Sequence, residues 1–243
     1  LRDDFNPKDL SNFILVKVGN FIRKNTSQPQ AARVYYEEAL NRENDQSHKF
    51  AAIFGLADVS AKGSSKAQKT EAIKLLKRVI DDSDDNSERE EAQYLTASIH
   101  ADNGDYDKAI EAAKEYINNK SFRQYSVPAR MLLGAAHDKS GRADDALIAY
   151  QQVWSSSMGA IRYSAPAMKR WMEILWSRSG SNKSGLSDRQ YAYEKGYMYI
   201  KLTTLAVKKA TPDERAVYAE VAELVQTYEA NSDTEPVLEE EEN

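Results

Sequence analysis

Three histidines, His48, His100 and His137, are the residues best suited to bind a metal or to transfer protons near neutral pH. Two of them, His100 and His137, hold the same position in successive sequence repeats. As zinc ligands they would need a carboxylate or a third histidine beside them, and the chain has no cysteine. We therefore predict no metal site. We expect each of the two to replace an inward aromatic residue and to hydrogen-bond a neighbouring helix.

The common catalytic motifs are missing from the sequence. It has no glycine-rich loop ending in Lys-Ser or Lys-Thr for phosphates, no His-Glu-x-x-His for zinc, and no Gly-x-Ser-x-Gly turn for a nucleophilic serine. We predict no catalytic residue and no cofactor. An enzyme is the weakest of the functions that we consider.

Tyrosines are numerous, and several of the 14 gather in one predicted helix after two tryptophans. Trp171 and Tyr199 fall on apolar stripes, and we expect them in the core. Tyr193 and Tyr197 lie off that stripe, one turn apart. With Trp176 they could form an aromatic platform for a glycan or another small ligand, since aromatic rings give a large contact area at low entropic cost. Ordinary packing between helices is the alternative.

The elements that must position these side chains are repeated along the chain. Residues 125–129, Tyr-Ser-Val-Pro-Ala, return at 163–167 as Tyr-Ser-Ala-Pro-Ala, and residues 104–110 return in altered form at 141–147. A period in this range indicates stacked helical hairpins. The second helix of each hairpin has apolar residues at positions i, i+4 and i+7, a spacing that predicts one buried face. These sets are Ala32, Tyr36 and Ala39; Ala72, Leu76 and Val79; Ala109, Ala113 and Tyr116; and Ala146, Tyr150 and Val153.

The fourth hairpin resembles the tetratricopeptide repeat family most clearly. The family pattern is W-x2-L-G-x2-Y followed by A-x3-F, and here Leu133-Gly134-x2-His137 is followed by Ala146-x3-Tyr150. The leading tryptophan of the pattern is missing from the four clearer repeats, and the period is longer than the family's. The resemblance implies an all-α fold, a right-handed α-solenoid of about five helix-turn-helix repeats with a C-terminal capping helix.

We predict one repeat domain over residues 1–230 and a disordered acidic tail over 231–243. The predicted hairpins span about 11–42, 47–81, 88–119, 127–157 and 165–203, and the capping helix spans 211–229. Thr211-Pro212-Asp213-Glu214 is typical of a helix start, with a threonine cap, a proline in the first turn and a glutamate three residues after the cap. We expect this last helix to cover the exposed face of the last repeat. Residues 61–70 are expected to lengthen one turn, and residues 177–188 to form a Ser/Gly-rich loop.

A concave groove lined by the first helices is the site that the resemblance implies. Its mixture of apolar, amide and charged side chains suits an extended peptide or a helix of a partner protein better than a phosphate. We therefore predict a protein-protein interaction scaffold or adaptor, and the glycan-binding platform is the alternative. The predicted groove residues are Asn20, Arg23, Leu56, Tyr94, Ser98, Met131, Lys169, Glu173 and Trp176.

Charge and hydropathy limit the other partners. The formal net charge of −5 comes largely from the acidic tail, and the remaining chain is close to neutral, which argues against nucleic-acid binding. No apolar run is long enough for a transmembrane helix. The chain begins with Leu1 rather than Met, and we expect it to be a fragment or a processed chain. The sequence leaves homo-oligomer formation open, and the family resemblance favours the bacterial envelope over the cytoplasm.

Overall fold

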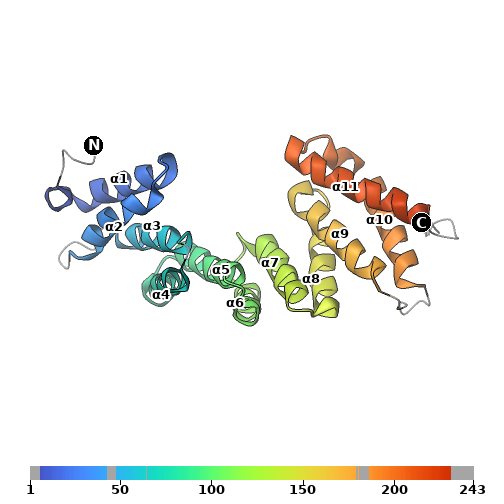
Figure 1. Ribbon diagram of the computed structural model, residues 1–243, viewed down its shortest axis with the longest axis horizontal. Coiled ribbons are helices and arrows are strands. Elements are labelled where there is room, and N and C mark those ends of the chain that lie inside the picture. The colour runs from blue at the N-terminus through green and yellow to red at the C-terminus, as the bar shows by residue number, and fades with distance from the viewer. Residues whose placement is uncertain (1–5, 43–47, 64, 179, 181–185, 231–243) are drawn as a thin grey trace. The chain divides into compact units, whose positions relative to one another are not determined.

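The structure is a computed structural model that describes residues 6–42, 48–63, 65–178, 180 and 186–230 (Figure 1). All regular elements in these residues are helices. The chain forms two compact units, residues 1–126 and 127–243, and each is described by itself. A single repeat domain over 1–230 stays a prediction, and the predicted acidic tail lies outside the described residues.

Unit 1 is a succession of helices in which each one packs against the next. Second helices pack against both neighbours, so α2 contacts α1 and α3, and α4 contacts α3 and α5. The elements are the 3-10 turn η1 (Pro7–Asp9), α1 (Asn12–Asn25), the 3-10 turn η2 (Pro29–Ala32), α2 (Arg33–Leu40), α3 (Lys49–Ala61), α4 (Lys66–Asp82), α5 (Asn86–Asp102) and α6 (Tyr106–Asn118).

Unit 2 begins in the first turn of α7 and ends with a helix that packs on two others. Helix α9 contacts α8, α10 and α11, and α10 also contacts α11. In Figure 1 these helices run from green to red, and α11 lies beside α9 and α10. The elements are α7 (Ser126–Lys139), α8 (Ala143–Ser156), α9 (Ile161–Trp176), α10 (Asp188–Val207) and α11 (Pro212–Glu229).

Helix starts follow the capping chemistry in the sequence. Thr211 and Glu214 form the predicted reciprocal capping box at the start of α11. A second capping box joins Ser65 and Gln68 at the start of α4. The predicted lengthening of the turn over 61–70 is wrong for residues 66–70, which belong to α4, because Ser65 caps a helix that begins at Lys66. Of the predicted loop 177–188, half of the residues lie outside the described part of the chain.

The buried stripes of the second helices are confirmed. All twelve residues of the four predicted sets are buried. Tyr36 lies between two glycines: a Cβ at Gly19 would be 2.7 Å from its Cε1, and a Cβ at Gly55 would be 2.2 Å from its Cζ. Tyr150 meets Gly134 in the same way, at 2.9 Å. The glycines of α1, α3 and α7 thus make room for a tyrosine ring of a second helix.

Candidate partner-binding surfaces

On α1 and α3, a polar network joins the predicted residues Asn20 and Arg23 to Asp58. Arg23 Nη1 lies 2.5 Å from Asp58 Oδ2, and Asn20 Oδ1 accepts hydrogen bonds from Arg23 Nη2 at 3.2 Å and from Tyr36 OH at 3.0 Å. Burial alone would raise the pKa of Asp58, but hydrogen bonds from Lys62 and Arg23 outweigh it and lower the pKa. The carboxylate therefore stays charged, and this network fixes the Arg23 guanidinium.

Tyr94 and Ser98 continue this surface on α5, and both are half-buried. The side chain of Glu91, one turn before Tyr94, is exposed but partly desolvated. This desolvation and the charge of Glu88 raise its pKa, while Arg23 opposes the rise. Arg23 of α1 is thus close enough to α5 to act on it electrostatically. We call Asn20, Arg23, Asp58, Tyr94 and Ser98 the first-helix face of unit 1.

Tyr94 is half of a stacked aromatic pair. Its ring lies parallel to that of Tyr125, with centroids 4.7 Å apart and an interplanar angle of 6°. The edge of the pair meets Tyr116, whose centroid is 6.4 Å from that of Tyr94. Tyr125 lies in the segment that follows α6, so this segment contributes to the first-helix face.

A buried glutamate holds that segment in place. Glu90 Oε1 accepts hydrogen bonds from the backbone N–H groups of Arg123 at 2.6 Å and Gln124 at 2.5 Å, and another from Tyr116 OH. Tyr116 OH in turn accepts from the N–H of Tyr125 at 2.8 Å. Burial, together with the bond to Glu90, raises the pKa of Tyr116. The sequence analysis missed Glu90 and Tyr125, although a glutamate in line with Ala97 on α5 was a signal for a buried carboxylate.

The prediction that Leu56 lines a partner groove is wrong, because its side chain is only 4% exposed. Helix α3 packs against α1, α2, α4 and α5. It therefore buries residues on nearly every side, Ile53, Gly55 and Val59 among them. Leu56 belongs to the core of unit 1.

In unit 2, the predicted groove residues of α9 lie along α11. Lys169 forms an ion pair with Glu220 of α11, and this bond is the main cause of the raised pKa of Lys169. Trp176 stacks on Tyr228 of α11, with ring centroids 3.7 Å apart and planes 3° apart. Glu173 lies between these two contacts in sequence and pairs with Arg170 at 2.9 Å. The chain's own last helix thus occupies the side of α9 that we expected to face a partner.

Met131 is the remaining predicted groove residue. It is half-buried on α7 and packs against the core of unit 2. That core includes Trp171 and Tyr199, both buried as predicted. Met131 therefore supports packing within unit 2.

The predicted aromatic platform does not form. Tyr193 is fully buried and donates a hydrogen bond to Glu229 Oε1 at 3.2 Å. The ring of Tyr197 is tilted by 49° from that of Tyr193, with centroids 6.3 Å apart. Trp176 offers one face to Tyr228. A sugar needs coplanar rings open to solvent, and packing by α11 removes them.

The two repeat histidines both face a carboxylate at the start of the following helix. His137 is buried, and its Nδ1 lies 3.7 Å from Asp145 Oδ2. His100 is half-buried, and its Nδ1 lies 3.9 Å from Asp105 Oδ2. The described residues contain no group of three or more His, Asp or Glu side chains that could hold a metal ion.

His100 makes the stability of unit 1 depend on pH. Burial, and then Lys108, lower its pKa, and these effects outweigh Asp105 and Glu111. The unfolded chain, with an ordinary histidine pKa of about 6.5, then binds more protons than the folded chain as the pH falls. We expect the free energy of unfolding to decrease below about pH 6.5. Thermal unfolding against pH should show a steeper loss in the wild type than in His100→Gln, and equal slopes would contradict this.

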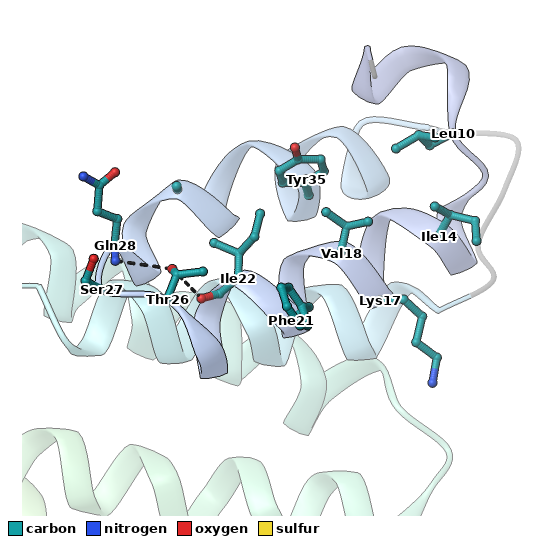
Figure 2. A pocket seen from close by; sticks show the side chains of 11 residues that line it. Leu10, Ile14, Lys17, Val18, Phe21, Ile22, Thr26, Ser27, Gln28 and Tyr35 are labelled. Carbon is teal, nitrogen blue, oxygen red and sulfur yellow. Dashed lines mark hydrogen bonds between the residues drawn. The ribbon is translucent and has the colours of Figure 1, made fainter. Parts of the chain in front are cut away.

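An apolar cavity of about 620 Å³ lies on the side of α1 away from its buried face. Figure 2 shows Ile14, Val18, Phe21 and Ile22 along α1, with Tyr35 of α2 opposite. Leu10, Lys17 and Ala31 also line it, with residues 26–28 at one end. Sequence reasoning missed this cavity, because only the inner stripe of α1 was sought. The run Phe13-Ile14-Leu15-Val16, apolar all round, was the available signal.

Comparison with known proteins agrees with this fold. Residues 91–119 match the family model described as tetratricopeptide repeat, and this range holds most of α5 and all of α6. The crystal structure of the MamA protein is similar in fold, with a TM-score of 0.52, 19% sequence identity, and coverage of 93% of this chain and 98% of that chain. No curated protein matches the sequence.

The chain is therefore an all-α helical-repeat protein. More particularly, its third hairpin matches the tetratricopeptide repeat model, in agreement with the resemblance predicted from the sequence. Among the described residues, no helix is long and apolar enough to cross a membrane.

Proposed function

We propose that the chain is a protein-interaction scaffold that binds an extended peptide or a helix of a partner protein on the first-helix face of unit 1, without catalysis of its own. The observations that carry this proposal are the stacked pair Tyr94 and Tyr125 and the fixed ion pair of Arg23 and Asp58. Glu91 of α5 connects them, because it lies within electrostatic range of both Arg23 and Tyr125. A rigid aromatic pair is a suitable anchor for a peptide side chain. Charges of both signs beside it can set the register and direction of the peptide.

The tetratricopeptide match over 91–119 supports the same face, because α5 contributes Tyr94 and Ser98 to it. In this family, first helices are the elements that hold peptide ligands. The residues predicted on α9 are left out of the proposed site, because α11 lies on them. Glycan binding is not proposed, since Tyr193 is buried.

Affinity capture from a lysate of the source cells tests this proposal. We expect the wild type to retain a partner that Tyr94→Ala and Ser98→Arg each lose by about tenfold, the change typical of an interface anchor. Ser98→Arg fills the face without removing an aromatic contact. Ser155→Arg is the matched control, because Ser155 is exposed on α8 and bonds to the carbonyl of Gln151 in its own helix. Equal capture by all four proteins would contradict the proposal.

A further inference from the structure

Helix α1 is apolar on two opposite sides. Leu15, Val16 and Gly19 face the core of unit 1. On the other side, Ile14 and Phe21 are 40% and 58% exposed and line the cavity. Exposed apolar side chains gathered around a hollow mark a binding surface more often than scattered ones do.

The packing within the chain indicates which kind of element fits this side of α1. Helix α3 is covered by α2, the second helix of the preceding hairpin, and in the same way α4 covers α5 and α8 covers α9. In the described part of the chain, only the short turn η1 precedes α1, and η1 packs on α2. A helix is therefore the element that fits this side of α1, and a repeat needs such a neighbour to bury its apolar face.

Charge indicates which kind of helix fits. Helix α1 contains Lys17, Arg23 and Lys24 and no acidic residue. Lys17 lines the cavity, and Lys24 is exposed one turn beyond it. On α2, the acids Glu37 and Glu38 already pair with arginines, Glu37 with Arg33 of the same helix and Glu38 with Arg42 just after it. Asp9, an exposed acid on η1, precedes Leu10 in sequence at the far end of the cavity.

We propose that this cavity is a docking surface for an amphipathic helix of a partner protein, with small and large apolar residues at i, i+4 and i+7 and acidic residues beside that stripe. A second copy of the chain fits less well, because antiparallel α1 helices would bring like charges together. A lipid surface also fits less well. Tyr35 and Ala31 close the hollow on the side of α2, and a hollow receives a protruding ridge.

A synthetic peptide with the sequence of residues 142–157 is a suitable probe. This segment forms α8, carries the stripe Ala146, Tyr150 and Val153 beside Asp144 and Asp145, and packs on a first helix, α9, in the intact chain. A fluorescent label would report its binding to the full chain by anisotropy. The matched control peptide carries lysine in place of both aspartates.

We expect the acidic peptide to bind the wild type and to bind Phe21→Asp at least about tenfold more weakly. Leu202→Asp is the control protein, because Leu202 is 60% exposed on α10 and its substitution adds the same charge. Lys17→Glu should weaken the binding of the acidic peptide and strengthen the binding of the lysine peptide. A purely apolar contact would not give this reversal. Phe21 is exposed, so circular dichroism should show unchanged folding in Phe21→Asp.

Three results would overturn the proposal. The first is absence of peptide binding to the wild type, or binding that Phe21→Asp leaves unchanged. The second is a wild-type dimer in sedimentation velocity that Phe21→Asp converts to a monomer, which would assign the cavity to a second copy. The third is binding to vesicles of phosphatidylserine and phosphatidylcholine that Phe21→Asp abolishes, which would assign it to a lipid surface. The site is separate from the first-helix face, so Ser98→Arg should leave peptide binding unchanged.

Discussion

Gly55→Ala is expected to destabilise unit 1 by about 3 kcal/mol or more. The added Cβ would lie 2.2 Å from Cζ and 2.3 Å from Cε1 of Tyr36. The ring has little room to move away, because the backbone of Gly19 also packs against it, and a Cβ there would lie only 2.7 Å from Tyr36 Cε1. Thermal unfolding followed by circular dichroism, with hydrogen exchange to locate the change in residues 6–126, should show the loss.

Two further variants make this prediction specific. Gly104→Ala places a side chain at φ +77° with no atom within 4 Å, so it should cost only about 1–2 kcal/mol from backbone strain. In a Tyr36→Leu background the clash is removed, and Gly55→Ala should cost little or even stabilise the helix, since alanine is the better helix former. A cost for Gly55→Ala that is the same with and without the tyrosine ring would contradict the account.

Glu90→Ala is expected to cost about 2–3 kcal/mol and to weaken partner binding as well. The substitution leaves the N–H groups of Arg123 and Gln124 and the hydroxyl of Tyr116 without their acceptor. The segment that carries Tyr125 should then lose its fixed position, and the stack on Tyr94 with it. Faster hydrogen exchange at 122–126 and reduced capture of the partner would be the joint signature.

Glu91→Ala is the matched control for Glu90→Ala, because this neighbouring glutamate is exposed. We expect it to change stability by less than about 0.5 kcal/mol. Similar losses in the two variants would mean that charge on α5, rather than the bonds to the following segment, supports the fold there.

The buried stripes of the second helices were predictable because, in a helix that packs on one side, apolar residues recur at i, i+4 and i+7. Ala72, Leu76 and Val79 of α4 are an example, and all three are buried. The helix starts were predictable where a side chain caps the backbone, as Thr211 does. In both cases the signal lies within a few residues of the structure that it predicts.

The first helices were harder to predict, because they are packed on several sides. We expected Leu56 to be accessible because we took α3 to pack on one side only, but α3 contacts four other helices. The apolar run from Ala51 to Ala57, broken only by Gly55, indicated this enclosure.

Helix α11 accounts for the errors in unit 2. Its start was predicted correctly, but its place depends on contacts far apart in the sequence, such as Lys169 with Glu220 and Trp176 with Tyr228. Since α10 packs against both α9 and α11, Tyr193 is buried although it lies off the expected stripe. The periodicity of apolar residues within α11 does not indicate which side of which neighbouring helix α11 will cover.

Site-specific photo-crosslinking tests the central claim most directly. A benzophenone-bearing amino acid would replace Ser98 on the first-helix face or, as the control, Lys114, which is exposed on α6. Both full-length proteins would be irradiated in cells and the products identified by mass spectrometry. We predict a crosslinked partner protein from position 98 that is absent from position 114. A partner crosslinked from position 114 and not from position 98 would contradict the claim that the first-helix face of unit 1 is the binding surface.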